Sequence, residues 1–439
     1  MSLSYSSALA YLNHFTDHSK THAANLAPEN FNLARVRALM TALGDPHLSY
    51  PVIHIAGTKG KGSTAAFCAG ALQAAGYKTG LYTSPHLVDY TERFQINRTP
   101  ILPNAFAALV EDIQPHVAQI PATTSFEIEA ALAFWYFARQ DVQAAVIEVG
   151  MGGRLDATNV VHPVVSVITT ISLDHVPILG HTVAEIAGEK AGIIKEGRPV
   201  VSGPQTSPAR AVIHAIAREQ HAPLVQVGEQ VTFTAGASYP DKQRFHLQYR
   251  EEAPVELEIS LLGPHQIENA TTAYAALRVA HEQGLSLPAD AIRTGFATTA
   301  WPGRFEILTR DPVPLILDGA HNQDSARRLR ETLHLLFPDR PVVWVFGVSG
   351  DKNVREMLAE LRSAGPPEML IATQSAHARA MPAAQLAALA QAVGFDARAH
   401  PHLAEAVALA RATVPAHGLI LITGSLFVVG EARPLLKLG

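Results

Sequence analysis

PVIHIAGTKGKGS, residues 51–63, is the stretch of sequence that decides the fold. Its first six residues are mostly apolar or β-branched, which predicts a buried strand. A glycine-rich loop follows over residues 57–63, and the Ala-rich segment of residues 63–75 then predicts a helix that Gly76 ends. Glycines let backbone N–H groups approach a polyphosphate, and the helix adds its positive N-terminal end. The stretch therefore predicts a strand, a phosphate-binding loop and a helix.

The loop carries side chains that suit a nucleotide triphosphate. Lys61 can neutralise charge on the β- and γ-phosphates, and Ser63 supplies a hydroxyl group. The spacing departs from GxxxxGK[ST], because fewer residues precede the central Gly-Lys pair and Gly62 separates Lys61 from Ser63. An ordinary glycine-rich turn between strand and helix is the alternative. Three glycines and two lysines within seven residues favour phosphate binding.

Strands and helices alternate along the first two thirds of the chain. Further strands are predicted at residues 79–83, 144–149 and 164–170, and helices at residues 125–139 and 182–195. This order implies a parallel sheet with helices on both faces. Between residues 226 and 262 the pattern changes to three short alternating runs, at residues 230–233, 244–249 and 255–260. They predict a small antiparallel sheet, and a helix over residues 266–282 follows.

A second alternating series begins after Trp301-Pro302-Gly303. Its predicted strands are residues 315–317, 342–346, 369–372 and 419–422. The fold class is therefore α/β, with a phosphate-loop (P-loop) parallel-sheet domain over residues 1–300 and a smaller, Rossmann-like C-terminal domain over residues 301–439. A hinge is expected near residues 298–302. Ligands bind at the carboxyl ends of such strands, so the site should lie in the cleft between the two domains.

Three titratable residues near predicted strand or helix ends are candidates for chemistry. Glu148 ends the apolar run of residues 144–147, where a carboxylate beside a phosphate loop suits Mg²⁺, although a surface glutamate is the alternative. The glycine-rich turn of residues 150–153 lets the backbone approach a ligand. His175 follows the strand of residues 164–170, but a lone histidine is more often structural. Lys190 lies on a predicted helix, and its neighbours alone favour a solvated lysine paired with a glutamate.

Bulk composition excludes several classes of protein. The chain has 439 residues, 48% of them hydrophobic and 17% charged, with a formal net charge of −5. This is an ordinary globular composition that points to no nucleic-acid partner. Cys68 is the single cysteine, so no intramolecular disulfide forms. No apolar run reaches about 18 residues, and residues 1–10 lack the features of a secretory signal. We therefore expect no membrane partner and a cytoplasmic location.

Ten short segments, taken together and in order, carry a resemblance to a known family. They are GTKGKGS (57–63), TSPHL (83–87), ERF (92–94), SFE (125–127), EVGMGGRLDATN (148–159), LDH (173–175), EKAGI (189–193), HQIENA (265–270), WPGR (301–304) and DGAHN (318–322). The ordered set, which covers nearly the whole chain, resembles the folylpolyglutamate synthase/dihydrofolate synthase family, relatives of the Mur ligases. No single motif is decisive, but the ordered set is highly specific.

The resemblance implies an ATP-dependent ligase that adds L-glutamate to folates through an acyl phosphate, with dihydropteroate as a further candidate substrate. It implies ATP contacts by Lys59, Gly60, Lys61, Gly62, Ser63, Asn269, Arg304 and Asp318, and Mg²⁺ ligands at Ser84, Glu148 and His175. Residues expected to line the pterin pocket are Thr124, Ser125, Phe126, Glu127, Leu155, Asp156 and Ala157. Lys61, Glu148, His175 and Lys190 form the expected catalytic set. Lys190 matches a lysine that the family can carry as a carbamate.

Two positions depart from the family pattern. Lys59 stands where many members have asparagine, although lysine also occurs there, and Gln323 follows Asn322 where proline is more usual. Two other functions compete with the folate ligase. A Mur-type ligase for a peptidoglycan precursor is disfavoured, because only about 50 residues precede Gly57 and an extra N-terminal domain would be needed. A nucleotide-binding regulator would bind ATP without glutamate-dependent phosphate release. We expect small-molecule substrates and a monomer; the sequence leaves open which pterin substrates are used.

Overall fold

An eight-stranded sheet holds the phosphate loop at the carboxyl end of its central strand. The computed structural model describes residues 3–16, 32–362 and 368–437. The strand order is β4-β3-β2-β5-β1-β6-β7-β8. The strands are β1 (Val52–Ala56), β2 (Thr79–Tyr82), β3 (Phe94–Ile96), β4 (Thr99–Pro100), β5 (Ala144–Glu148), β6 (Val165–Ile168), β7 (Val200–Ser202) and β8 (Leu224–Gln226). The two pairings of β3, with β2 and with β4, are antiparallel, whereas β2, β5, β1, β6, β7 and β8 run parallel and end at one edge.

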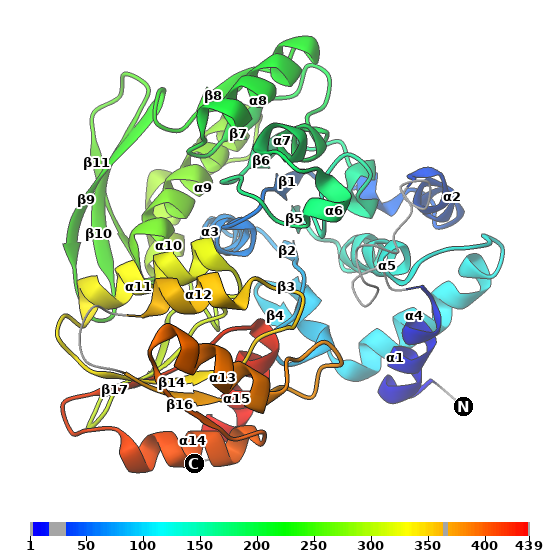
Figure 1. Ribbon diagram of the computed structural model, residues 1–439. Helices are drawn as coiled ribbons and strands as arrows, with labels where there is room; N and C mark the ends of the chain where they lie inside the picture. The colour runs from blue at the N-terminus through cyan, green and yellow to red at the C-terminus, as the bar shows by residue number, and fades with distance from the viewer. Residues whose placement is uncertain (1–2, 17–31, 363–367, 438–439) are drawn as a thin grey trace.

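Helices cover both faces of this sheet (Figure 1). One face packs against α3 (Lys61–Ala74), α9 (Pro264–Glu282) and α10 (Ala289–Ala297). The other face packs against α5 (Ser125–Arg139), α7 (Val183–Ala191) and α8 (Ser207–Glu219). All five residues of β1 and of β5 are buried, because both faces of these strands are covered. The expected parallel sheet with helices on both faces is confirmed.

Smaller helices complete the N-terminal part of the chain. They are α1 (Tyr5–His14), α2 (Ala34–Ala42), η3 (Pro46–Leu48), η4 (Tyr90–Arg93), α4 (Pro103–Val117), η5 (Ala157–Val160) and α6 (Val176–Leu179). The helix predicted over residues 182–195 is shorter than expected, because α7 ends at Ala191 and Gly192 follows as its cap. No helix of the described segments has both the length and the apolar character needed to cross a membrane.

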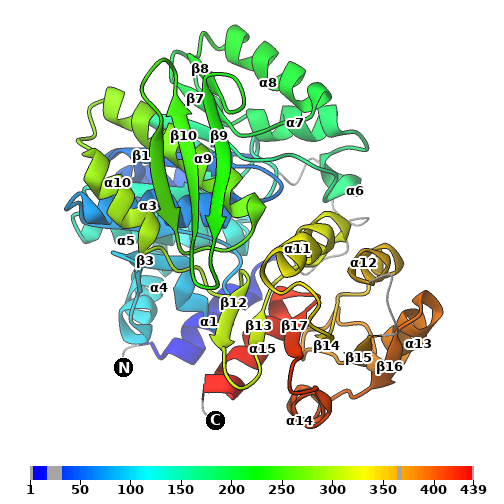
Figure 2. The ribbon, with the colours of Figure 1, turned by 90° about the vertical axis from the view of Figure 1, so that its left-hand side faces the viewer.

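The predicted antiparallel excursion is confirmed as a separate three-stranded sheet. Its order is β11-β10-β9, with β9 (Val231–Ser238), β10 (Gln243–Tyr249) and β11 (Val255–Ile259). The burial of β10 alternates, which places Phe245, Leu247 and Tyr249 in the same core as α9. In Figure 2 this sheet lies in front of α9 and α3. It therefore closes the outer side of the helices that flank the phosphate loop.

A six-stranded sheet forms from the second half of the chain, in the order β12-β13-β17-β14-β15-β16. The strands are β12 (Glu306–Thr309), β13 (Leu315–Leu317), β14 (Val342–Phe346), β15 (Met369–Ala372), β16 (Asp396–Ala399) and β17 (Leu419–Thr423). The helices are α11 (Gln323–Leu336), α12 (Val354–Leu361), α13 (Ala383–Val393), α14 (Leu403–Thr413) and α15 (Leu426–Lys437). Trp344 packs under α11 to α13, whereas its neighbours Val343 and Val345 pack under α14 and α15. This sheet lies below the first in Figures 1 and 2, and α11 faces α9 across the junction.

Close packing of α3 against α10 fixes the helix that follows the phosphate loop. A Cβ atom added at Gly295 would lie 2.4 Å from the backbone N of Ala71, and one added at Gly70 would lie 3.0 Å from the carbonyl O of Gly295. The two helices therefore meet backbone to backbone, which only glycine permits.

We predict that Gly295→Ala destabilises the protein by about 1–3 kcal/mol, because the added methyl group meets backbone that cannot move aside. Gly188→Ala is the matched control, since Gly188 also lies inside a helix, α7, but its added Cβ would meet nothing within 4 Å. That control should be neutral or stabilising by up to about 1 kcal/mol. Urea unfolding of the two variants measures both effects. Equal unfolding midpoints would contradict the packing argument.

Candidate active site

The glycines of the phosphate loop are required by close neighbours. Gly57 leaves β1 with φ 149°, and a Cβ atom there would lie 1.8 Å from Oγ1 of Thr169. Gly60 has φ 88°, and its Cβ would lie 2.1 Å from Oδ1 of Asn269 on α9. The backbone N–H groups of Thr58 and Lys59 both donate to the carbonyl of Thr170, at 3.0 and 3.2 Å. The loop is thus pinned from both sides, and Asn269 lies against it.

Glu148 and Lys61 face one another at the carboxyl ends of β5 and β1. The Nζ atom of Lys61 lies 3.9 Å from Oε1 of Glu148, and the backbone N–H of Ser84 donates to Oε2 at 3.3 Å. Burial raises the pKa of Glu148 to about 6, although Lys61, the Ser84 N–H and Arg304 oppose the shift. The structure therefore brings together Lys61, Ser84 and Glu148, and leaves the carboxylate short of positive partners.

Lys190 is buried beside the same loop, with 4% of its surface exposed. Its ammonium donates to the carbonyl of Gly57 at 2.9 Å, and burial, followed by the charge of Lys61, lowers its pKa to about 7. The prediction from its sequence neighbours alone, that Lys190 is a solvated lysine, is wrong. Glu189 instead forms an ion pair with Arg154 at 2.8 Å.

His175 lies just before α6 with a left-handed backbone (φ 50°). His175 is exposed at the surface, yet the surrounding protein also shields its ring from much of the solvent. Desolvation, followed by the charges of Lys352, Lys190 and Lys61, lowers its pKa to about 4 against the opposing effect of Asp174. At neutral pH His175 therefore carries a free nitrogen lone pair.

The chemistry of Ser84, Glu148 and His175 suits a divalent cation, and the structure joins Ser84 to Glu148 by a hydrogen bond. The three residues offer a hydroxyl, a neutral imidazole and a carboxylate whose pKa is raised by burial. Within the described ranges, no three His, Cys, Asp or Glu residues gather as a metal cluster. Mg²⁺ commonly binds through one or two protein groups together with substrate phosphates and water, so a sparse set of this kind suits it.

Arg304 and Asp318 enter the site from the second sheet. Asp318 follows β13, and its two oxygens accept from the backbone N–H groups of Phe305 and Ala320, both at 2.9 Å. The charge of Arg304 acts on both Asp318 and Glu148, lowering the pKa of each against the effect of burial. Arg304 therefore lies between carboxylates of the two sheets, which is where it would meet a nucleotide held by both.

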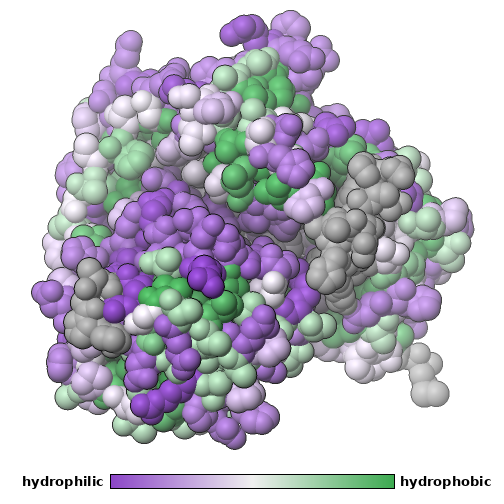
Figure 3. Space-filling view, in the orientation of Figure 1, coloured by the Kyte–Doolittle hydropathy of each residue, from purple (hydrophilic) through white to green (hydrophobic). Residues whose placement is uncertain are grey.

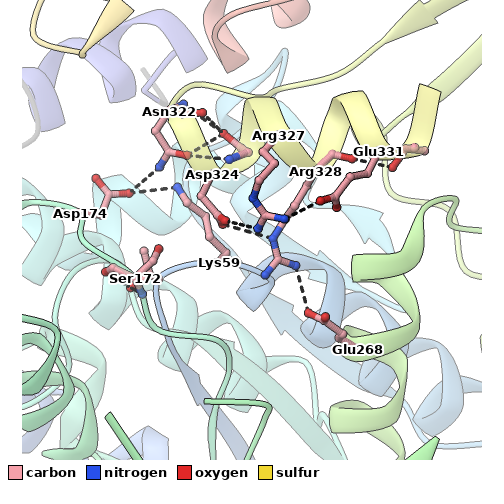
Figure 4. A network of polar contacts seen from close by, with 12 residues as sticks. Lys59, Ser172, Asp174, Glu268, Asn322, Asp324, Arg327, Arg328 and Glu331 are labelled. Carbon is pink, nitrogen blue, oxygen red and sulfur yellow. Dashed lines mark hydrogen bonds and ion pairs between the residues drawn. The ribbon is translucent and has the colours of Figure 1, made fainter. Parts of the chain in front are cut away.

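Polar contacts between the two sheets converge on Asp174 (Figure 4). Its carboxylate lies 3.1 Å from Nζ of Lys59, 3.8 Å from Nζ of Lys352 and 3.5 Å from Nδ2 of Asn322. A second link joins Arg328 of α11 to Glu268 of α9 at 3.0 Å. Lys59, expected from the resemblance to contact phosphate, thus directs its ammonium at Asp174.

A cavity of about 760 Å³ lies between the sheets and reaches the loop. Its walls include Gly62, Ser84 and Glu148 from one side, and Arg304 and Arg433 from the other. Hydrophilic side chains gather over α11, beside a hollow in the same face (Figure 3). An open cavity therefore lies between the sheets, where the sequence predicted the site.

The expected pterin residues lie elsewhere, and several make structural contacts. Thr124 and Glu127 form the capping box of α5, and Glu127 also pairs with Arg35 at 2.9 Å. Asp156 accepts from the backbone N–H groups of Met151 and Thr158, at 2.9 and 3.0 Å. Phe126 packs on Gly150, where a Cβ atom would lie 2.3 Å from its ring.

Phe126 therefore joins the segment of residues 124–127 to the one containing residues 155–157. Ser125 donates its backbone N–H to Thr16 O at 3.1 Å, Leu155 is half-buried and Ala157 is buried. None of the seven expected pterin residues is among those that line the 760 Å³ cavity.

Sequence reasoning missed four residues of the site region. Asp174 and His321 lie within motifs but were not predicted as site residues, and their nearness in sequence to His175 and Asp318 was the available signal. Arg35 and Lys352 lie outside every motif, so only the folded chain brings them to Glu127 and Asp174.

Comparison with known proteins agrees with this arrangement. Residues 55–277 match the Mur ligase middle domain family, and residues 303–426 match the family described as Mur ligase, glutamate ligase domain. The chain is 35% identical over 439 residues to folylpolyglutamate synthase of Lacticaseibacillus casei, covering 98% of both chains. It is 39% identical over 338 residues to dihydrofolate synthase/folylpolyglutamate synthase of Bacillus subtilis, covering 75% of this chain and 78% of that protein. The solved structure of Mycobacterium tuberculosis folylpolyglutamate synthase with ADP superimposes with a TM-score of 0.88 at 35% identity, covering 98% of both chains.

We predict that Glu148→Gln stabilises the ligand-free protein at pH 8 by up to about 2 kcal/mol. The folded pKa of about 6 lies above the ordinary value of 4.5, so ionised Glu148 opposes folding above pH 6. This penalty fades as the pH falls from 6 to 4.5, and the two proteins should then converge. Urea unfolding at several pH values without nucleotide measures the difference, with Glu189→Gln as a control at an ion pair nearer the surface. A constant difference across this range would contradict the argument.

Proposed function

The chain belongs to the folylpolyglutamate synthase/dihydrofolate synthase family of Mur-type ligases, and from this premise we propose how its residues carry out the reaction. The protein is an ATP-dependent ligase that adds L-glutamate to folates. We propose dihydropteroate as a second acceptor, supported by the name of the Bacillus subtilis relative, which includes both activities. The observation that carries the mechanism is that Glu148, which pairs with Lys61, lines the cavity between the sheets together with Arg304.

Amide formation from a carboxylate requires activation, because a carboxylate is a poor electrophile. The carboxylate of the folate attacks the γ-phosphorus of ATP and forms an acyl phosphate, and ADP leaves. The amino group of glutamate then attacks the acyl carbon and inorganic phosphate departs. Charge on the transferring phosphoryl group must be stabilised, and Lys61 and Arg304 are the cations that reach this position.

Water must be excluded while the acyl phosphate survives. The contacts of Asp174 with Asn322 and Lys352, and of Glu268 with Arg328, hold the second sheet over the loop and support this role. We propose a division into an ATP-binding domain of residues 1–300 and a ligase domain of residues 301–439. Asn269 and Asp318 would then grip the nucleotide from opposite domains.

We propose that Ser84, Glu148 and His175 hold Mg²⁺. When bound, the ion would supply positive charge beside the phosphoryl oxygens and the missing counter-charge for Glu148. Ser84 and Glu148 are already joined by a hydrogen bond from the serine backbone, so their side chains need little rearrangement. His175 presents a lone pair because its imidazole is neutral.

The pterin pocket is proposed at residues 124–127 and 155–157, supported by the packing of Phe126 on Gly150. The buried carboxylate of Asp156 would stay an anchor for the backbone of this loop. The monomeric state, the cytoplasmic location and the lack of a nucleic-acid partner remain predictions from the sequence. The alternative peptidoglycan ligase finds no support in the relatives named above, which are folate enzymes.

The ligase reaction itself gives the direct test of function. Purified protein should release phosphate only when ATP, glutamate and a folate or dihydropteroate are all present. Lys61→Ala should lower this rate on the order of 10²–10³-fold, since it removes the cation that faces the phosphoryl group. A coupled phosphate assay with each pterin in turn measures the substrate range. Near wild-type turnover by Lys61→Ala would show that the loop does not serve ATP in this way.

Lys190 is predicted to be a carbamate in the working enzyme. Carbamate forms from neutral amine and CO₂, and a pKa near 7 makes roughly half of the amine neutral at pH 7. The product is an anion that would suit the cations around Lys61 and the proposed Mg²⁺. ¹³C NMR with labelled bicarbonate should show a carbamate signal that Lys190→Arg abolishes. Lys195→Arg, which removes another lysine of lowered pKa, should leave the signal in place. An unmodified Lys190 bound to Gly57 with ATP and Mg²⁺ present would contradict this.

A further inference from the structure

Lys59 lies where three loops of the molecule meet. It belongs to the phosphate loop between β1 and α3, Asp174 follows β6, and His321 follows β13 of the second sheet. The Nζ atom of Lys59 lies 3.1 Å from Oδ2 of Asp174 and 3.3 Å from Nε2 of His321. Figure 4 shows the side chain extended towards Asp174. One ammonium group therefore touches both halves of the protein.

The proton positions of His321 follow from its other contact. Its Nδ1 atom lies 2.8 Å from the carbonyl O of Gly319, and a carbonyl only accepts hydrogen bonds. Nδ1 therefore carries the proton, and Nε2 of the neutral ring is a free acceptor aimed at Lys59. The charge of Lys59, followed by burial, lowers the pKa of His321 to about 3, so the ring stays neutral under working conditions. The contact is a true hydrogen bond from Lys59 to His321.

Lys59 is also fixed at its backbone. Its N–H donates to Thr170 O at 3.2 Å, one residue from Thr169, which limits Gly57. Its side chain is 14% exposed and that of Asp174 is 13% exposed, so water screens the pair only weakly. A displacement of His321 would therefore be felt by the loop that carries Lys61.

The ion pair of Arg328 with Glu268 offers a useful contrast. It also crosses between the two sheets, at 3.0 Å, but it joins helix α11 to helix α9, and Arg328 pairs in addition with Asp324 of its own helix at 3.2 Å. Its glutamate is 31% exposed. Arg328 can hold the halves together, whereas Lys59 links their docking to the loop itself.

We propose that Lys59 is a positioning residue that bridges Asp174 to His321 and so sets the phosphate loop when the second domain docks. Its ammonium is directed at Asp174 and His321, and in this role it does not serve as a phosphate ligand. Asp318, expected at the nucleotide, lies on the same loop as His321. Docking of the second domain would thus bring Asp318 and the phosphate loop to the same ATP molecule. Only the expected effect on the kcat for ligation rests on the proposed function; the bridge itself does not.

Lys59→Met tests this, because it keeps the stem and removes the charge and the donors. ATP affinity should change less than threefold, since no phosphate contact is lost. The kcat for ligation should fall on the order of 10²-fold, because a small misplacement of reacting groups is costly. Arg328→Met is the matched control for an interdomain contact away from the loop and should lower kcat much less. Lys59→Met in an Asp174→Asn background should add little, since both remove one bridge.

Titration of His321 by NMR gives a readout that ligation does not affect. With labelled histidine, and the signal assigned by its loss in His321→Gln, the pKa should rise from about 3 towards the ordinary 6.5 in Lys59→Met. It should stay low in Arg328→Met. This measurement needs neither folate nor glutamate, so it distinguishes failure of the bridge from failure of the proposed function.

Three results would overturn the inference. They are an unchanged His321 pKa in Lys59→Met, a loss of ATP affinity as large as that of Lys61→Ala, or an unaltered kcat. If Lys59→Met does not fold, as judged by its urea midpoint, Lys59→Asn replaces it in every measurement. Asparagine is the residue that many family members carry there, and it is too short to span Asp174 and His321 as lysine does.

Discussion

The parallel pairing of β1 with β5 is the constraint on which the rest of the site depends. In this register Ile55 is level with Glu148, so Gly57 and Glu148 leave the sheet at the same edge. On the other side of β1, Ala56 is level with Ile168, which places Thr169 against Gly57. A slip of one residue would turn Glu148 to the opposite face and away from Lys61. Burial of every residue in both strands makes such a slip costly, because each of the two cores would receive side chains that pack in the other.

Unbalanced charge is the second organising feature. Burial raises the pKa of Glu148 and lowers the pKa of Lys190, so each group is ionised at a cost within a few ångströms of the loop. Asp174 is different: burial alone would raise the pKa of this carboxyl, but the neighbouring groups, Lys59 first and Lys352 among them, together hold it below its usual range. Opposite charges therefore pair closely at the junction between the two sheets, whereas the charges of Glu148 and Lys190 at the phosphate loop remain unfavourable. Anionic phosphates with a cation would supply what is missing there, and ligand binding would stabilise the fold accordingly.

The sequence predicted the kinds of element well, and their partners much less well. The run of residues 51–63 predicted strand, loop and helix correctly, because local periodicity and glycine placement determine all three. Strand order depends on pairing between distant segments, so the position of β5 between β2 and β1 was not predictable from either strand. The surroundings of the Lys190 side chain were likewise not predictable from its own segment. The backbone around Lys190 packs against Gly153, where a Cβ atom would lie 2.8 Å from the carbonyls of Glu189 and Lys190. The sequence of α7 alone does not indicate that contact.

The chain that links the two sheets also packs beside the phosphate loop. Trp301, in the predicted hinge, lies against Gly62, where a Cβ atom would be 3.1 Å from its ring. Leu87 contacts both Gly303 and Gly430, so the start of the second domain and α15 rest on the loop that follows β2. The hinge expected near residues 298–302 therefore lies beside the phosphate loop. Precise alignment of ATP is thus best assigned to short contacts next to Gly57–Gly62, and the larger surface between α9 and α11 to holding the domains together.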